Sequence, residues 1–161
     1  MEQLEIQNAK PSDMPMLKEI VDLSFARFFR YFALHSIKSK DGIVLVLQVD
    51  KKVVGFAKLI QFKINGENFG CILWLAVHPN SRQKGFASAL VAAGTKHLIA
   101  QGAKAVFASV MRNNKASLAT FSKEGFKRIG FLGLWERFGF RVFSFYGSIW
   151  FMPGEIALIK E

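Results

Sequence analysis

The most informative segment of this chain is Val77-His78-Pro79-Asn80-Ser81-Arg82-Gln83-Lys84-Gly85-Phe86-Ala87-Ser88-Ala89-Leu90. An apolar strand candidate, residues 71–77, precedes the turn, and a helix candidate rich in small residues follows it. The first N–H groups of a helix have no partner within the helix, and the helix dipole favours negative charge there. The stretch therefore predicts an anion-binding turn, with Arg82 and Lys84 adding positive charge and Gly85 allowing close approach of a ligand.

Two common phosphate-binding motifs do not fit this turn. A P-loop requires a second glycine followed by Lys-Ser or Lys-Thr, and the dinucleotide fingerprint requires three glycines. Here Gly85 stands alone and Ala87 follows two residues later. An ordinary strand-to-helix connection with surface charges is the alternative interpretation of the same residues.

The composition indicates one globular domain spanning residues 1–161. The chain has 161 residues, 51% of them apolar, and 17 phenylalanines, which argues against disorder. Its longest stretch without a charged residue, residues 68–81, is too short to span a membrane as a helix. The acidic start of the chain has no apolar run, so no secretory signal is expected. With a single cysteine, Cys71, an internal disulfide is excluded and a cytoplasmic protein is expected.

The net charge of +10 is concentrated in the second half of the chain. Residues 1–80 carry 10 basic and 8 acidic side chains, whereas residues 81–161 carry 12 and 4. This excess favours a polyphosphate ligand, an acidic substrate or nucleic acid as a partner, although a solubilising surface would have the same composition. Nucleic acid is the least favoured partner because no helix-turn-helix or aromatic RNA-binding signature is present.

The periodicity of apolar residues predicts an α/β (α+β) protein. A helical pattern extends from Ser12, a candidate N-cap, to about Phe32, and a break somewhere within residues 25–39 would give two helices rather than one. Asn65-Gly66 predicts a tight hairpin, and Gly102 and Gly125 are expected to end helices. Residues from Phe126 to the C-terminus are aromatic-rich and are interpreted as strands. The predicted strands are residues 4–8, 43–49, 53–64, 68–77 and 104–110, and the later helices are residues 86–100 and 114–124.

At this point the chain resembles the GNAT superfamily of acyl-CoA N-acyltransferases. The segment from Arg82 to Ala87 is similar to the family's Arg/Gln-x-x-Gly-x-Gly/Ala loop, which holds the coenzyme A pyrophosphate through backbone amides. Asn114, followed by Phe121 and Gly125-Phe126, resembles the family's Asn…Tyr…Gly-Phe segment. The resemblance implies a mixed, mostly antiparallel sheet of about six or seven strands, flanked by about four helices, with a V-shaped splay between strands 4 and 5.

The resemblance also implies a site for acetyl-CoA, or another acyl-CoA, as cosubstrate. The pantetheine arm would pair with the free edge of the fourth strand like an added strand, and Asn114 would hydrogen-bond it. No metal is expected, because His35, His78 and His97 lack the spacing of a metal site. The residues implied in cofactor binding are Leu75, Ala76, Val77, Arg82, Gln83, Lys84, Gly85, Phe86, Ala87, Asn114 and Phe121.

The chain departs from the family's pattern at the catalytic groups. Phe121 occupies the position where many members have the tyrosine that steadies the departing thiolate, and phenylalanine has no proton to donate. The fourth strand, residues 68–77, has no carboxylate to serve as the general base. The catalytic residues are therefore unassigned, with Glu67, His78 and Tyr146 as candidates. Tyr146 is assigned to the C-terminal strand region, where packing beside Phe145 and Trp150 is its alternative role.

The expected activity is acetyl transfer from acetyl-CoA to an amine, by direct attack in a ternary complex. The acceptor is expected to be a small-molecule or peptide amine. The resemblance implies that it contacts residues 26–41 and 132–153. Without a strong base an α-amine is favoured, because deprotonation at pH 7 costs about 1 kcal/mol for an α-amine and about 4.6 kcal/mol for a lysine. The alternatives are a catalytically silent acyl-CoA-binding module and, third, a nucleic-acid-binding protein. A homodimer through the phenylalanine-rich C-terminal segment is also expected.

Overall fold

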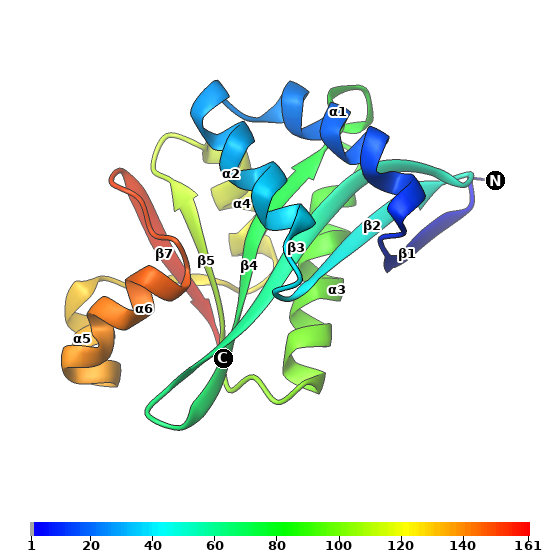
Figure 1. Cartoon of the computed structure of the whole chain (residues 1–161). Helices are drawn as coiled ribbons and strands as arrows, with labels where there is room; N and C mark the ends of the chain where they lie inside the picture. Colours follow the sequence, from blue (N-terminus) through cyan, green and yellow to red (C-terminus); the bar gives the residue numbers. More distant parts are fainter. Residues whose placement is uncertain (1) are drawn as a thin grey trace. The chain divides into compact units, whose positions relative to one another are not determined.

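The computed structural model describes residues 2–161 and contains seven strands and six α-helices within that range. The strands are β1 (Leu4–Asn8), β2 (Ile43–Val49), β3 (Lys52–Ile64), β4 (Glu67–Val77), β5 (Val106–Met111), β6 (Lys127–Arg128) and β7 (Glu155–Lys160). The helices are α1 (Met14–Ser24), α2 (Arg27–Lys38), α3 (Phe86–Ala100), α4 (Lys115–Lys123), α5 (Phe131–Phe138) and α6 (Val142–Ser148) (Figure 1). None of the helices in this range is both long and apolar enough to cross a membrane.

The strands form one mixed sheet in the order β1-β2-β3-β4-β5-β7-β6. β4 and β5 are parallel, paired through Gly70–Val106, Cys71–Phe107 and Ile72–Ala108. The pairs β1–β2, β2–β3, β5–β7 and β6–β7 are antiparallel. The predicted mixed, mostly antiparallel sheet is thus confirmed, whereas the splay between β4 and β5 stays a prediction.

Contacts between Cα atoms divide the chain into two compact units. Unit 1 comprises Met1–Leu59 with Trp74–Gly94, and unit 2 comprises Ile60–Leu73 with Thr95–Glu161. The single-domain organisation expected from the sequence stays a prediction. Each unit has its own apolar core, so the two are described one after the other.

In unit 1, α1 and α2 pack on one face of β2 and β3 (Figure 1). Leu17, Ile20 and Val21 recur at helical spacing on α1 and are at most 1% exposed. They join Phe56 of β3 in a core that also includes residues of α2 and of the end of β4. The apolar stripe read from the sequence therefore forms core rather than a ligand site.

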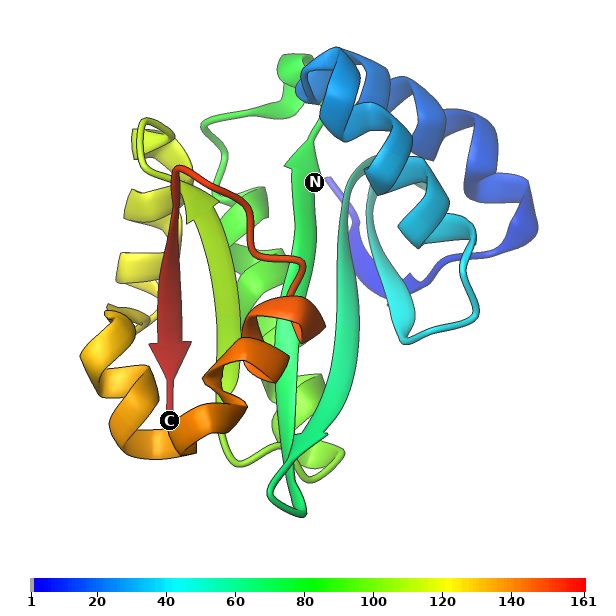
Figure 2. The ribbon, with the colours of Figure 1, turned by 60° about the vertical axis from the view of Figure 1, so that its left-hand side comes forward.

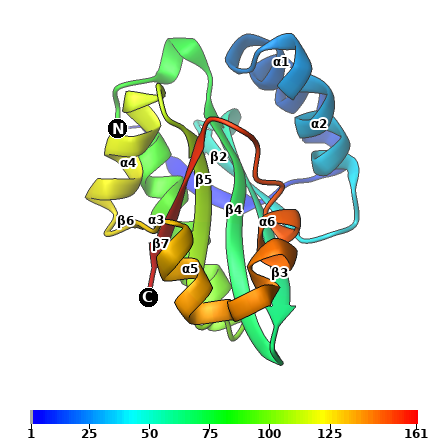
Figure 3. The same cartoon turned by 90° about the vertical axis from the view of Figure 1, so that its left-hand side faces the viewer.

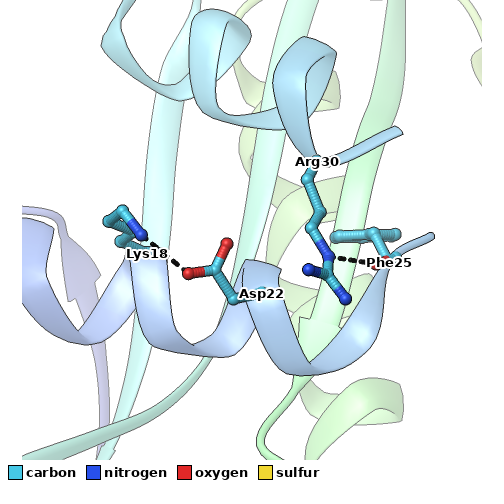
Figure 4. Close-up of polar contacts among 4 residues, drawn as sticks. All are labelled: Lys18, Asp22, Phe25 and Arg30. Carbon is cyan, nitrogen blue, oxygen red and sulfur yellow. Dashed lines mark hydrogen bonds and ion pairs between the residues drawn. The ribbon is translucent and has the colours of Figure 1, made fainter. Parts of the chain in front are cut away.

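The segment that the sequence left open as one helix or two forms two, with the break at Phe25, whose backbone is extended (φ −117°, ψ 146°). Arg30 donates from Nε to the Phe25 carbonyl at 2.7 Å and so bridges the break, while Lys18 pairs with Asp22 within α1 (Figure 4). The N-cap expected at Ser12 is wrong, because residues 11–13 form a single 3-10 turn and α1 begins at Met14. The Asp13 carboxylate accepts from the Lys10 N–H at 2.7 Å instead.

In unit 2, β5 and β7 are covered on one face by α5 and α6 (Figure 2), and α4 lies on the other side of these strands (Figure 3). Phe107 of β5 lies at the centre of an aromatic cluster with Phe62, Phe69, Phe138 and Phe145, at centroid distances of 4.7 to 6.3 Å. Edge-on and tilted ring pairs of this kind stabilise a core beyond the area that they bury.

The strands expected after Phe126 are wrong for most of that segment. Only β6 and β7 are strands, and residues between them form α5 and α6, which also raises the helix count above the expected four. The buried residues Leu134 and Phe138, and then Val142, Phe145 and Ile149, recur at three- and four-residue spacing, which is a helical period. Their aromatic composition favours strands by propensity, but burial of one helical face decides the structure.

The turn predictions are confirmed. Asn65 and Gly66, between β3 and β4, have φ of 53° and 78°, the combination that a two-residue hairpin requires. Gly102 and Gly125 follow α3 and α4 with φ of 97° and 89°.

Candidate functional site

The anion turn, residues 82–87, connects β4 with α3 in unit 1. Gln83 and Gly85 have φ of 62° and 81°, which lie in the left-handed region. Both residues precede α3, which begins at Phe86. A left-handed conformation is disfavoured for glutamine, and such local strain is typical of ligand-binding turns. The first helical bond runs from Ala89 N–H to the Gly85 carbonyl at 3.0 Å, so the preceding N–H groups lie at the open end of the helix.

Gly85 is required by its conformation rather than by crowding. A Cβ built on Gly85 would meet no atom within 4 Å, so the space next to the turn is open. The side chains of Gln83 and Lys84 are exposed, whereas Phe86 is 8% exposed and anchors the helix start in the core. The turn thus combines a fixed backbone with the exposed cation of Lys84 and the first N–H groups of a helix, an arrangement suited to an anion.

Arg82 holds the turn in place. Its Nε donates to the Val77 carbonyl at 3.0 Å, and its Nη2 donates to the Ser24 hydroxyl at 3.2 Å. The guanidinium therefore ties the turn to the end of β4 and to the end of α1. Leu75 is half-buried and Ala76 and Val77 are buried, 7% and 6% exposed, so only the backbone of this strand end is suited to contact a ligand.

His78 is engaged at both ring nitrogens. Its Nδ1 accepts from the Asn80 N–H at 3.1 Å, which requires the ring proton to reside on Nε2. Nε2 lies 3.4 Å from the Glu19 carboxylate, on the wall of a cavity of about 210 Å³ that Lys52, Lys84 and Phe86 also line. Both ring nitrogens therefore already face groups of the protein itself. The geometry is that of a turn-stabilising histidine.

The second motif lies in unit 2. Asn114 is the N-cap of α4, and its Oδ1 accepts from the Ser117 N–H at 3.2 Å. Phe121 is 3% exposed and packs edge-on against Phe126 at a centroid distance of 5.1 Å. The ring that replaces the family's tyrosine is therefore part of the core.

Glu67 and Tyr146, the other catalytic candidates, also lie in unit 2. Glu67 is exposed at the start of β4 and pairs with Lys104 at 2.5 Å. Tyr146 lies in α6 and not in a strand, which corrects the location expected for it. Its ring packs on Phe145 and Phe151 at 5.6 and 4.7 Å, and burial raises the pKa of its hydroxyl.

Glu155 is a carboxylate that the sequence reasoning missed. It is half-buried at the start of β7, and burial raises its pKa even though the Met152 N–H (2.8 Å) and the Ser109 hydroxyl donate to it. Cys71 is fully buried, and both that burial and the nearby Glu155 charge raise the pKa of its thiol, which excludes a thiolate nucleophile at neutral pH. A partly buried carboxylate beside hydrogen-bond donors is a common environment for a general base.

A sequence signal for Glu155 exists. It is the only acidic residue between Glu136 and Glu161, it begins an apolar run, and Pro153-Gly154 precedes it. A carboxylate at the start of a buried strand is unusual, because isolated charges are costly to bury. Among residues 2–161 no group of three or more His, Cys, Asp or Glu side chains is arranged to hold a metal ion.

Comparison with known proteins assigns a family. A family model described as the acetyltransferase (GNAT) family matches residues 10–126. No curated protein matches the sequence. Among solved structures, PaiA N-acetyltransferase from Thermoplasma acidophilum, in complex with coenzyme A, is 16% identical with a TM-score of 0.69, over 99% of this chain and 99% of that chain.

Two further structures have the same fold. Ribosomal-protein-S18-alanine N-acetyltransferase from Escherichia coli is 19% identical with a TM-score of 0.65, over 98% of this chain and 91% of that chain. N-acetylglutamate synthase from Neisseria gonorrhoeae, in complex with coenzyme A and N-acetyl-glutamate, is 17% identical with a TM-score of 0.65, over 98% of this chain and 35% of that chain. At these identities the likeness establishes the fold alone. The family model, which spans well over half of the 161 residues, establishes more: this chain belongs to the acetyltransferase (GNAT) family.

Proposed function

We propose that this protein transfers an acetyl group from acetyl-CoA, or an acyl group from another acyl-CoA, to an amine acceptor. The observation that carries the proposal is the anion turn, in a chain that belongs to the acetyltransferase (GNAT) family. Gln83 and Gly85 at positive φ, with the turn fixed by Arg82, support a role in holding the pyrophosphate. Lys84 adds an exposed positive charge next to it.

The remaining cofactor contacts follow the family resemblance. The backbone of Leu75, Ala76 and Val77 pairs with the pantetheine amides in this proposal, and the Asn114 amide NH₂ donates to a pantetheine carbonyl. The Oδ1 of Asn114 is already engaged in capping α4, which orients the NH₂ group. Phe121 contributes apolar packing and no proton.

The chemical step is a direct attack of the amine nitrogen on the thioester carbonyl carbon. A C–N bond forms, the C–S bond breaks, and coenzyme A leaves as a thiolate. Because a thiol has a pKa of about 8.5, its thiolate can leave without protonation by an acid. The proton lost by the amine passes to the general base, which we assign to the Glu155 carboxylate. Its half-burial and its raised pKa support this assignment over Glu67, which is paired with Lys104.

The assignment of Glu155 changes the expectation for the acceptor. An α-amine was favoured because no strong base was evident in the sequence, and a carboxylate with a raised pKa removes that premise. The acceptor is proposed as a small-molecule or peptide amine without preference for an α-amine. A cytoplasmic location and a homodimer also stay predictions. The dimer contact would involve α5, α6 and the 3-10 turn between them, where Leu132, Phe143 and Phe140 respectively are 65–80% exposed.

A catalytically silent acyl-CoA-binding module is the second candidate function. The observation that favours it is the buried Phe121 ring, which has no hydroxyl and lies in the core. Binding and turnover distinguish the two functions, because only an enzyme releases thiol from acetyl-CoA in the presence of an amine. A nucleic-acid-binding protein would respond to neither coenzyme A nor acetyl-CoA.

Coenzyme A and acetyl-CoA are expected to raise the melting temperature of the protein, since a ligand that binds only the folded state stabilises it by mass action. Lys84→Glu is expected to weaken binding about tenfold, or about 1.4 kcal/mol, because it replaces a phosphate partner by a like charge. Thermal shift and isothermal titration with coenzyme A measure both effects.

Lys96→Glu is the matched control. Lys96 is exposed on the body of α3, and its substitution changes the net charge by the same amount as Lys84→Glu. The proposal predicts that this variant binds coenzyme A like the wild type. Equal losses in the two variants would mean that only net charge matters. Absence of any stabilisation by either ligand would refute the cofactor assignment.

A further inference from the structure

Unit 1 contains a cavity of about 520 Å³ that none of the proposed coenzyme A contacts lines. The cavity lies where α1 begins, α2 ends, and the adjoining ends of β1 and β2 meet β3. Its apolar wall includes Met14 and Leu17 of α1, Ile37 of α2 and Val44 of β2. Its volume is within the range of small-molecule sites, and its lining is mainly apolar with a few polar groups, as such sites are.

A buried cation also lines this cavity. Lys58 of β3 is 1% exposed, although lysine is almost never fully buried without a partner. Among residues 2–161 its Nζ has one hydrogen bond, to the Ser39 carbonyl at the C-terminal end of α2, and at 3.5 Å this bond is long. An ammonium group has three protons to donate. Within the part of the chain that the structure describes, Lys58 makes no ion pair.

The surroundings of Lys58 are positively charged. Lys10 and Lys38 also line the cavity, both exposed, and no carboxylate does. The one opposing charge that acts on Lys58 is that of Asp41, which is exposed in the loop after α2. Desolvation outweighs that charge and lowers the pKa of Lys58. The ammonium is therefore under-compensated in the absence of a ligand.

We propose that this cavity binds a monocarboxylate with an apolar chain, whose carboxylate pairs with Lys58 and whose chain lies against Met14, Leu17, Ile37 and Val44. The carboxylate supplies both the missing counter-charge and the missing hydrogen-bond acceptors, and the chain removes apolar surface from water. This site is separate from the anion turn, so the inference goes beyond the proposed acyl transfer and stands without it.

The chemistry of the lining selects this class of ligand. An alkyl ammonium would place a fourth cation beside Lys58, Lys10 and Lys38. An alcohol of the same chain length would fill the apolar wall but supply no charge. A free phosphate would leave the apolar wall in contact with water. Only an anion with an apolar chain satisfies both the lysine and the wall.

Isothermal titration of the full chain with octanoate, 1-octanol and octylammonium tests the proposal. Octanoate is expected to bind at least tenfold more tightly than the other two compounds. Lys58→Met, which keeps the length and apolar stem of the side chain, is expected to lose at least tenfold in octanoate affinity. Lys63→Met is the matched control, because Lys63 is exposed on the same strand and lies outside the cavity lining; its octanoate affinity should equal that of the wild type.

A second variant guards against misfolding of Lys58→Met. Val44→Phe fills part of the cavity while leaving Lys58 in place, and it is expected to weaken octanoate at least tenfold as well; circular dichroism checks that each variant is folded. If octanoate does not bind, or binds no better than 1-octanol, Lys58 serves only as a structural cation at the end of α2 and the proposal is wrong. The proposal is equally wrong if Lys63→Met loses as much octanoate affinity as Lys58→Met.

Discussion

Replacing the carboxylate of Glu155 by an amide, in Glu155→Gln, is expected to lower kcat by about 10² to 10⁴-fold. This is the usual contribution of a positioned general base, and glutamine cannot accept the proton that the attacking amine must lose. Binding of coenzyme A should be unchanged, because the proposed cofactor contacts lie elsewhere in the chain. The measurement is thiol release from acetyl-CoA with an amine from a panel on which the wild type is active.

The pH dependence provides an independent check on Glu155. Burial raises the pKa of Glu155 above its ordinary 4.5, so the wild-type rate should fall as the pH drops through this raised pKa, where the base becomes protonated. This fall in rate at low pH should be absent in Glu155→Gln. If the variant shows the same fall at the same pH, another group is responsible for it.

Loss of activity through unfolding is not expected for Glu155→Gln. The folded chain holds the proton on Glu155 more tightly than the unfolded chain does, so stability falls as the pH rises from 4.5 through the raised pKa. Glutamine does not ionise and still accepts from the Met152 N–H through its amide oxygen. The variant should therefore be at least as stable as the wild type at pH 7, as urea unfolding would measure.

Two further glutamate variants make the test specific. Glu5→Gln, in an exposed position on β1, should have wild-type activity. Glu67→Gln should be nearly as active, because Glu67 is exposed and paired with Lys104. If Glu67→Gln loses the rate and Glu155→Gln does not, the base is Glu67 and the assignment of Glu155 is wrong.

Phe107→Ala is expected to lower the free energy of unfolding by about 3–5 kcal/mol. Phe107 is fully buried and packs against four other phenylalanines, so the substitution removes apolar contact and leaves a cavity that rigid neighbours cannot fill. Urea unfolding followed by circular dichroism measures the change. A loss below about 1 kcal/mol would mean that α5 and α6 collapse into the space.

Phe143→Ala is the control for Phe107→Ala. Phe143 lies in the same half of the chain on α6 but is 65% exposed, so its removal should change the free energy of unfolding by no more than about 0.5 kcal/mol. A large loss for Phe143→Ala would indicate that a partner chain covers this face. That outcome would support the predicted homodimer.

Local patterns predicted the elements that local chemistry controls. The Asn65-Gly66 turn and the glycines that follow α3 and α4 are correctly predicted, because turn and cap conformations depend on a few adjacent residues. The segment of α5 and α6 was assigned to strands, because its aromatic residues favour strands by composition. The helical spacing of Leu134, Phe138 and Phe145 is the competing signal, and burial of that face makes it the stronger one.

The anion turn is the part of the site that the sequence determined most fully. The spacing of Arg82, Gly85 and Ala87 predicts it, because backbone conformation and helix polarity favour an anion at a helix start. The structure adds that Gln83 shares the left-handed conformation with Gly85 and that Arg82 anchors the turn rather than serving as a free charge.

The burial and hydrogen-bond partners of the ionisable groups could be read only from the tertiary structure. His78 and Glu155 look alike in the sequence, as isolated titratable residues at the ends of apolar strands, yet His78 is engaged at both nitrogens and Glu155 is desolvated. Lys58 is one of 22 basic residues by composition, and its burial beside a cavity follows from how α1, α2 and β3 pack. Burial and hydrogen-bond partners come from residues distant in the chain, so the family motif follows from the sequence, whereas the environments of Glu155 and Lys58 required the fold.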